Sequence, residues 1–184
     1  NSNYKIMKYI GPDFCNITNL LTDEELLIQK TANEFVTKEF MPLVNEYYEK
    51  GSFPVDLIPK MGELGFFGAT LPKKYGGSEI SNTAYGLIMQ ELEKGDSGLR
   101  SVCSVQGGLV MYPIFQYGTE EQKDKWLPKL ASGEAVGCFG LTESNHGSDP
   151  GGMTTKAVKD GDDWIINGSK MWITNGTVAD VAVV

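Results

Sequence analysis

The chain changes structural class within residues 136–175, VGCFGLTESNHGSDPGGMTTKAVKDGDDWIINGSKMWITN. Apolar residues alternate with polar ones in this stretch, and closely spaced glycines separate the runs, as is typical of short strands and turns. Three strands are predicted, and their apolar residues are Val136, Cys138 and Leu141, then Trp164, Ile165 and Ile166, then Met171, Trp172 and Ile173. Asn167 followed by Gly168 predicts a tight hairpin turn, because both central positions of the favoured turn need a positive φ.

The residues before 135 are instead predicted to form helices. Thr22 with Glu25, and Thr119 with Gln122, are capping-box pairs that start helices. Apolar residues with helical spacing follow near residues 22–43, 57–64, 85–92, 97–116 and 119–132, and Pro42 is expected to break the first helix. Residues 1–20 show no periodicity and are predicted to form an irregular arm.

Helices followed by strands indicate an α+β fold. We expect an all-helical N-terminal domain over residues 1–134 and the beginning of an antiparallel β domain over residues 135–184, and a junction between two such parts is a usual place for a ligand cleft. The run Asp180 to Val184 reads as the middle of a strand, which predicts that the sequence continues into a longer chain.

The composition excludes several classes of protein. A formal net charge of −8 argues against nucleic acid or an anionic membrane as the partner, so an anionic substrate would have to be held by a few local cations. No apolar run is long enough for a membrane span, and no signal-peptide pattern opens the sequence. Three scattered cysteines without CxxC spacing favour a reducing compartment, and a single histidine gives no support for a zinc site.

Several polar positions have two readings. His146 lies in a polar, glycine-rich loop. We expect a solvated loop residue, and the alternative is a catalytic imidazole, which titrates near neutral pH. Cys138 alternates with apolar neighbours, which predicts a small buried residue rather than a nucleophile. The loop from Thr142 to Asp149 is either a polar hairpin loop or a set of backbone N–H groups that meets an anion or a heteroaromatic ring edge.

Two further features suggest a ligand. Trp172 and Thr174 share one face of a predicted strand, which would suit a flat cofactor and equally an ordinary half-exposed strand. Arg100 lies in an otherwise apolar helix, where its guanidinium needs an anionic partner. That partner is either a bound carboxylate or a neighbouring acid, Glu93 or Asp96. There is no GxGxxG after a strand and no P-loop sequence, so these nucleotide sites are not supported.

Two motifs carry a resemblance to a known family. The first motif, residues 137–153 (GCFGLTESNHGSDPGGM), and the second motif, residues 167–175 (NGSKMWITN), closely resemble the acyl-CoA dehydrogenase family of flavoenzymes. The helical segments MGELGFFGATLPKKYGG and GTEEQKDKWLPKLASGE resemble it as well. The segment YGLIMQELEKGDSGLRSVCSVQ is similar to the glutaryl-CoA dehydrogenase branch, through residues 96–98 and Arg100 with Ser101.

The resemblance implies a helical N-terminal domain, a middle β domain, a C-terminal helical bundle that is missing from this chain, and assembly as a homotetramer. It implies FAD as cofactor, an acyl-CoA thioester as substrate and electron-transfer flavoprotein as electron acceptor. The implied reaction is α,β-dehydrogenation, followed in the glutaryl branch by loss of CO2 to give crotonyl-CoA. The cytoplasm is the expected location, with the mitochondrial matrix as the alternative.

The resemblance also implies roles for particular residues. The positions that match FAD contacts are Phe139, Leu141, Thr142, Trp172, Ile173 and Thr174. The positions that match substrate contacts are Ser148 on the CoA part, Arg100 and Ser101 on the distal carboxylate, and Glu93 beside them. The family's catalytic glutamate belongs to the C-terminal half, so the base is not among these residues. Ser144 stands where proline is usual, and His146 where a small residue is common.

Three alternatives remain open from the sequence. Within the family, the chain could be part of a short-chain acyl-CoA dehydrogenase or of an acyl-CoA oxidase. Outside enzymes, it could be a non-catalytic relative that serves as a binding module, because no base and no complete flavin site can be assigned within it.

Overall fold

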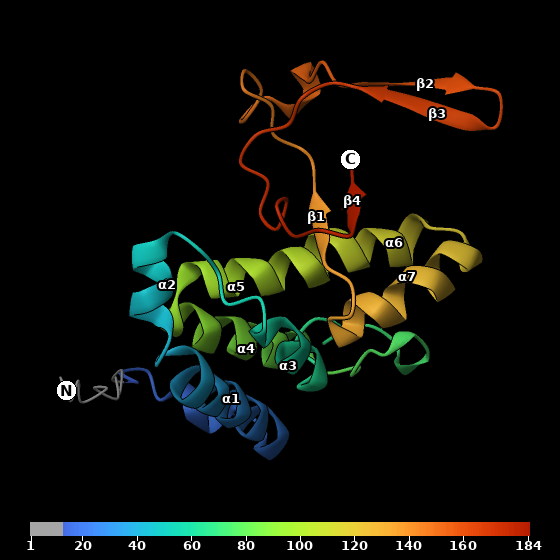
Figure 1. The fold of residues 1–184 in the computed structure, drawn as a ribbon. Helices are drawn as coiled ribbons and strands as arrows, with labels where there is room; N and C mark the ends of the chain where they lie inside the picture. The colour runs from blue at the N-terminus through green and yellow to red at the C-terminus, as the bar shows by residue number, and fades with distance from the viewer. Residues whose placement is uncertain (1–12) are drawn as a thin grey trace.

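The computed structural model describes residues 13–184 and separates a helical body from a β segment (Figure 1). The helices are α1 (Asp23–Phe35), α2 (Val44–Lys50), α3 (Leu57–Glu63), α4 (Asn82–Gly95), α5 (Ser97–Ser104), α6 (Tyr112–Tyr117) and α7 (Glu120–Ser132). The strands are β1 (Gly137–Phe139), β2 (Lys156–Asp160), β3 (Asp163–Asn167) and β4 (Val181–Val183). The order of helices before strands confirms the predicted α+β class.

Shorter helical turns complete the described part. Ile17–Leu20 is a 3₁₀ turn inside the stretch predicted to be irregular, and residues 1–12 of that stretch lie outside the described residues. Further 3₁₀ turns are Lys73–Tyr75 and Pro150–Gly152, and π-helical turns span Val36–Phe40 and Val105–Met111.

The helix starts and breaks follow the sequence. Both predicted capping boxes form: the backbone N–H of Glu25 donates to Thr22 Oγ1 and that of Gln122 donates to Thr119 Oγ1, each at 3.2 Å. The first helix gives way to a π-helical turn and then ends before Pro42, which confirms the predicted break. Within residues 13–184, no helix is long and apolar enough to cross a membrane.

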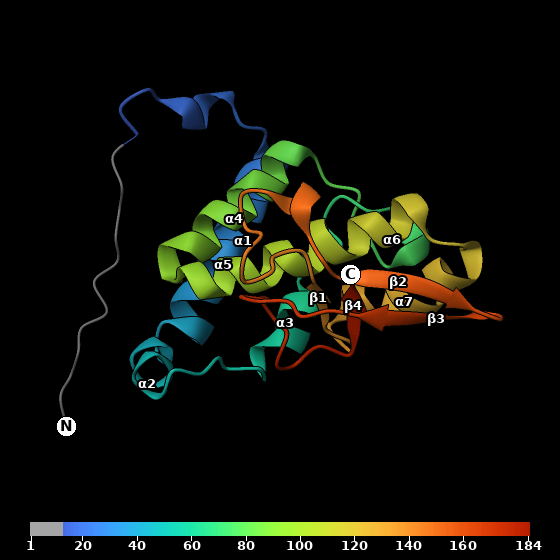
Figure 2. The same cartoon turned by 90° about the horizontal axis from the view of Figure 1, so that it is seen from above.

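The predicted helix over residues 97–116 is one continuous helical rod with a π-helical middle. It runs from α5 through Val105–Met111 into α6. Gly107 in the middle section lies against the chain after α3, since a Cβ there would be 2.6 Å from the carbonyl oxygen of Phe67. Figure 2 shows this rod beneath the strands, and β1 packs directly on its π-helical section.

The apolar core lies among the helices. Met61, Leu92, Leu99, Leu127 and Leu130 are all fully buried there. The hairpin formed by β2 and β3 instead leaves Val158, Trp164, Ile165 and Ile166 exposed. The helical part therefore has a core of its own, while the hairpin shown at the top of Figure 1 does not.

The predicted hairpin turn at Asn167 and Gly168 is wrong. β2 pairs with β3 in antiparallel register from Asp160 with Asp163 to Lys156 with Asn167, so the turn falls at Gly161, which has a φ of 62°. Asn167 ends the hairpin instead of turning it. Gly168 is needed for a close approach, because a Cβ there would lie 2.1 Å from Thr155 Oγ1.

Two further strand expectations need correction. Residues 171–173 are not a strand, because Trp172 has a φ of 60° and the chain then turns over residues 174–178. β1 pairs with β4 in parallel, with Gly137 opposite Val181, so only the β2–β3 pair is antiparallel as expected. The strand predicted around Cys138 ends at Phe139, before Leu141.

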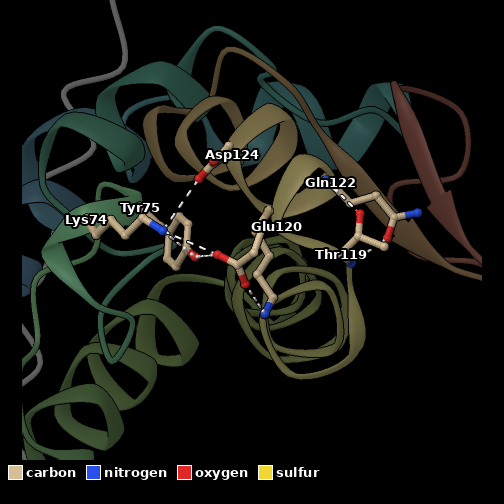
Figure 3. A network of polar contacts seen from close by, with 7 residues as sticks. Lys74, Tyr75, Thr119, Glu120, Gln122 and Asp124 are labelled. Carbon is tan, nitrogen blue, oxygen red and sulfur yellow. Dashed lines mark hydrogen bonds and ion pairs between the residues drawn. The ribbon is translucent and has the colours of Figure 1, made fainter.

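A polar network joins the turn after α3 to the start of α7 (Figure 3). The Tyr75 hydroxyl donates to Glu120 Oε2 at 3.2 Å, and Lys74 Nζ lies 3.4 Å from the same oxygen and 3.8 Å from Asp124 Oδ1. The Lys74 ammonium also lies 4.7 Å from the centre of the Tyr75 ring. The charged side chains are exposed, so the ion pairs add little stability on their own.

Replacing Thr119 with Ala should lower the free energy of unfolding by about 1 kcal/mol, because the α7 N-terminus loses its side-chain cap. Lys74→Ala should cost less, since its ion pairs lie in water. Urea unfolding of the two variants of the full-length protein would measure both. Equal losses would show that the Lys74 ion pairs contribute as much to this helix start as the Thr119 cap does; Figure 3 shows both.

Candidate functional site

Gln106 fixes the start of β1 against the helices. Its side-chain amide nitrogen donates to the carbonyl oxygens of Leu130 (2.9 Å) and Ala135 (2.8 Å), and its oxygen accepts from the backbone N–H of Gly137 (2.8 Å). The residue is only 1% exposed. The sequence analysis assigned it no role, although a polar residue in an apolar helix is the same signal that singled out Arg100.

The second motif returns to the base of the same strand. The Asn175 side chain donates to the carbonyl oxygen of Gly137 at 3.1 Å, and Asp180 Oδ2 accepts from the backbone N–H of Val136 at 2.8 Å. Asn175 has a φ of 66°, in the left-handed region that asparagine tolerates better than most residues. The two motifs therefore start and end at one point on the helical body.

Glu143 holds the middle of the two motifs together. Its carboxylate accepts from the backbone N–H of Thr154 (2.7 Å), the Thr154 hydroxyl (2.9 Å), the backbone N–H of Thr155 (2.9 Å) and Lys170 Nζ (2.9 Å). These donors, first of all the N–H of Thr154, hold the pKa of the Glu143 carboxyl well below its usual value. Sequence reasoning missed this role, because neither partner segment is close to Glu143 in the chain.

Two hydrogen bonds bring the predicted cofactor residues side by side. Lys170 Nζ donates to the carbonyl oxygen of Leu141 at 2.9 Å, and the backbone N–H of Met171 donates to the carbonyl oxygen of Thr142 at 2.9 Å. Leu141 and Thr142 of the first motif thus lie next to Trp172 of the second, which follows Met171 directly.

The side chains of this pair of segments face outward. Phe139, Thr142 and Ile173 are half-buried, and Leu141 and Thr174 are exposed. Trp172 is 86% exposed, although its left-handed backbone conformation costs about 1–2 kcal/mol for a residue with a Cβ. A strained backbone that presents an apolar ring to the outside is a pattern found at ligand-binding sites.

The same surface fits a flat cofactor with hydrogen-bonding edges. Within residues 13–184 nothing accepts from the backbone N–H groups of Leu141, Thr142, Trp172 and Thr174, and the Thr142 and Thr174 hydroxyls have no partner there. Such groups need a ligand or water. Free donors beside an exposed indole ring match what an isoalloxazine ring, with its carbonyl and nitrogen edges, would require.

The loop within the first motif, residues 143–149, is closed at its base by Glu143 and His146. Glu143 and His146 exchange backbone hydrogen bonds of 3.1 Å in each direction. Ser148 lies beyond them on the exposed part of the loop. His146 Nδ1 has no hydrogen-bond partner within the described residues and lies 3.9 Å from Asp149 Oδ2. His146 is half-buried, and its Nδ1 is buried, so the residue is not a fully solvated loop residue. Nothing in the described part of the chain orients the ring for a catalytic role either.

Arg100 pairs with Glu93 and not with Asp96. Arg100 Nε donates to Glu93 Oε2 at 2.7 Å, and Nη1 donates to Ser104 Oγ at 3.2 Å. Asp96 instead caps α5, accepting from the backbone N–H groups of Gly98 and Leu99. Hydrogen bonds from Ser97 and then Arg100 hold the pKa of Glu93 below its usual value. Nη2 of Arg100 has no partner among the described residues, and Ser101, half-buried, is the next residue on the helix.

Other candidate chemistry finds little support in the described part of the chain. Cys138 is buried, and burial raises the pKa of its thiol, as expected for a packing residue. No group of three or more His, Cys, Asp or Glu residues within residues 13–184 is arranged to hold a metal ion. A groove of about 520 Å³ is lined by residues such as Leu27 of α1 and Lys60 of α3, and none of its lining residues belongs to either motif.

The stabilising effect of Glu143 should disappear in acid. Because its pKa is lower in the folded state than its ordinary value of 4.5, its contribution is complete above that value and is lost as the pH falls below it. The difference in thermal stability between the wild type and Glu143→Gln should therefore be constant from pH 8 to 5 and shrink below about pH 4.5. A difference that grew in acid would contradict this ionisation state.

The comparisons with known proteins match both parts of the chain. Residues 22–134 match the model of the acyl-CoA dehydrogenase N-terminal domain, and residues 138–184 match that of the acyl-CoA dehydrogenase middle domain. The chain belongs to the acyl-CoA dehydrogenase family. FAD is the cofactor of this family.

Individual relatives include enzymes named for different substrates. The chain is 43% identical over 166 residues to a probable acyl-CoA dehydrogenase of Bacillus subtilis, and 42% identical to a short-chain specific acyl-CoA dehydrogenase of Clostridium acetobutylicum, covering 89% of this chain and 43% of each relative. Two structures of glutaryl-CoA dehydrogenase from Mycobacterium smegmatis match at 53% and 49% identity with TM-scores of 0.88 and 0.89, and the second is a complex with FADH2. They cover 91% of this chain and 43% of theirs, so the chain spans less than half the length of these relatives.

Proposed function

We propose that the whole protein is an FAD-dependent acyl-CoA dehydrogenase that acts on glutaryl-CoA, with decarboxylation to crotonyl-CoA. The observation that carries the activity is the joining of the two motifs, which places free backbone donors of Leu141 and Thr142 next to the exposed ring of Trp172. The high identity to a glutaryl-CoA dehydrogenase supports the substrate.

Each predicted site residue has a defined task in this proposal. The backbone N–H groups of Leu141 and Thr142 and the hydroxyl of Thr174 bind the edge of the flavin, while Phe139, Trp172 and Ile173 pack beside it. FAD, when bound, accepts the β-hydrogen of the substrate as hydride. Ser148 binds the CoA part of the substrate from the open loop. The base that removes the α-proton comes from the part of the protein beyond residue 184.

Arg100 would select the substrate. A guanidinium N–H donates a charge-assisted hydrogen bond to a carboxylate. Glu93 and Ser104 fix Nε and Nη1 of Arg100, which leaves Nη2 available and limits the rotamers of the side chain. Ser101 adds a hydroxyl one residue further along α5. The distal carboxylate of a dicarboxylic acyl chain is the ligand that these groups fit.

The remaining parts of the proposal concern partners and place. Electron-transfer flavoprotein is the proposed electron acceptor. From the family resemblance, the protein is proposed to assemble as a homotetramer. Its proposed location is the cytoplasm, with the mitochondrial matrix as the alternative. Gel filtration of the full-length protein tests the assembly directly.

An anaerobic absorbance titration of the full-length protein tests the proposed reaction. We expect an oxidised flavin band that glutaryl-CoA bleaches at lower concentration than butyryl-CoA. Bleaching by butyryl-CoA alone would assign the protein to the short-chain enzymes, as the Clostridium relative would suggest. Rapid reoxidation by O2 after bleaching would indicate an acyl-CoA oxidase. A colourless protein that takes up no FAD would mean a non-catalytic relative.

A further inference from the structure

We propose that Glu143 is a positioning residue for cofactor binding, and that with Lys170 it holds the two motifs in their binding arrangement before FAD arrives. The inference rests on the proposed function, because it concerns the same site. It goes beyond that function by assigning the arrangement of the site to two residues that contact neither substrate nor cofactor in the proposal.

The Glu143 carboxylate has no capacity left for another ligand. Two donors bind each oxygen: the N–H and hydroxyl of Thr154 bind Oε2, while the N–H of Thr155 and Lys170 Nζ bind Oε1. An ionised carboxylate has about four acceptor positions, and all four are used here. Its side chain is 4% exposed. These features exclude a role as a general base or a ligand, and leave that of a structural connector.

The hydrogen-bonding capacity of the Lys170 ammonium is also fully used. Its ammonium donates to Glu143 Oε1 and to the carbonyl oxygen of Leu141, and lies 3.8 Å from the sulfur of Met153. Three N–H donors therefore meet three acceptors. One of these acceptors is the backbone carbonyl of Leu141, so Lys170 links the second motif to the first. The next residue, Met171, donates its backbone N–H to the carbonyl oxygen of Thr142.

The described β segment has no apolar core that could hold the two motifs together. Among the described residues 139–184, only Gly140 and Glu143 are buried, and the last buried apolar residue is Cys138. In a packed core many contacts would share the task of holding two segments together. Here the arrangement depends on a few polar contacts, and Glu143 and Lys170 make most of those that join the motifs.

Glu91 provides a matched control. It is also a buried, ion-paired carboxylate, bound by Lys94 Nζ (2.6 Å), Asn33 Nδ2 (2.9 Å) and Gln29 Nε2 (3.1 Å). Its contacts join α4 to α1 inside the helical body, far along the chain from both motifs. Glu91→Gln and Glu143→Gln remove the same charge, and only the second should affect the cofactor surface.

The test uses the full-length protein with two readouts. FAD affinity is measured by fluorescence titration of the apoprotein, and hydrogen exchange of the Met171 amide is measured in the apoprotein without any FAD. We expect Glu143→Gln to weaken FAD binding roughly tenfold or more, as for other partners that orient the groups in direct contact with a ligand. Exchange at Met171 should accelerate by about the same factor. Glu91→Gln should lower the melting temperature but change neither readout.

The readouts separate the possible failures. If the wild type takes up no FAD but exchange at Met171 accelerates in Glu143→Gln, the proposed function fails while the connector between the motifs stands. If the wild type binds FAD and Glu143→Gln binds it equally well, the positioning role is overturned. If Glu143→Gln does not fold, Lys170→Met replaces it in the test. This variant keeps the three hydrogen bonds from Thr154 and Thr155 to Glu143 and removes the hydrogen bond to the carbonyl oxygen of Leu141. The same two outcomes decide the result.

Discussion

Arg100→Gln should lower kcat/KM for glutaryl-CoA by roughly 100-fold, which corresponds to about 2.7 kcal/mol of transition-state stabilisation. Arg100 is the only arginine in the sequence, and its side chain is 36% exposed on a helix whose other face is buried. Without it, the distal carboxylate of the substrate would lose the charge-assisted hydrogen bond from Nη2 and the positive charge beside it. The measurement is steady-state kinetics of the full-length protein with glutaryl-CoA.

Butyryl-CoA is the matched control substrate, because it has the same chain without the distal carboxylate region. We expect its turnover to change by less than about threefold in Arg100→Gln, since a neutral chain end gains nothing from a guanidinium. Arg100→Lys keeps the charge but not the planar fork, so its loss with glutaryl-CoA should be intermediate. Equal losses on both substrates would show that Arg100 supports the helix through Glu93 and does not select the acyl chain.

The helical half could be predicted closely from the sequence, because its signals are local. Thr119 and Gln122 lie three residues apart and form the whole cap of α7 between them. The break before Pro42 likewise follows from the geometry of one residue. Where the signal spans a single helical turn, no distant contact is needed to interpret it, and the structure agrees with the prediction.

The β half was predicted less well, because it contains competing local turn signals and contacts between distant segments. Asn167 followed by Gly168 is a strong turn signal, but β3 finds its partner in β2 and turns at Gly161. Trp172 was expected on a strand, yet the hydrogen bond from Met171 to Thr142 and the anchoring of Asn175 on Gly137 impose a turn with positive φ. At Trp172, contacts with distant residues override a local preference. In the hairpin, the chain turns at the local Asp160–Gly161 signal and not at Asn167–Gly168.

The candidate site shows the same division. The resemblance indicated the cofactor and substrate residues, whose roles remain predictions, but the residues that arrange them were not foreseen. Gln106 and Gly137 are 31 residues apart, and Lys170 and Glu143 are 27 apart. A single sequence gives no sign that such polar residues meet, because hydrogen bonding between distant positions leaves no periodic pattern.

Gln106→Leu should lower the free energy of unfolding by roughly 3 kcal/mol. The leucine side chain has a similar size but can neither donate nor accept. It leaves the N–H of Gly137 and the carbonyl oxygen of Ala135 buried without their side-chain partner, at about 1–3 kcal/mol each. The carbonyl oxygen of Leu130 keeps a bond from Gly133 and should contribute less. Urea unfolding of the full-length protein measures the loss.

Gln90→Leu is the control, because it makes the same substitution at an exposed position of α4 and should change stability by no more than about 0.5 kcal/mol. The consequence of Gln106→Leu should extend to the cofactor surface. Gly137 accepts the Asn175 bond that returns the second motif to β1, so a displaced β1 moves both motifs. We therefore expect FAD affinity to fall together with stability in Gln106→Leu. Lower stability with unchanged FAD affinity would mean that Glu143 and Lys170 keep the motifs aligned independently of their anchor on the helical body.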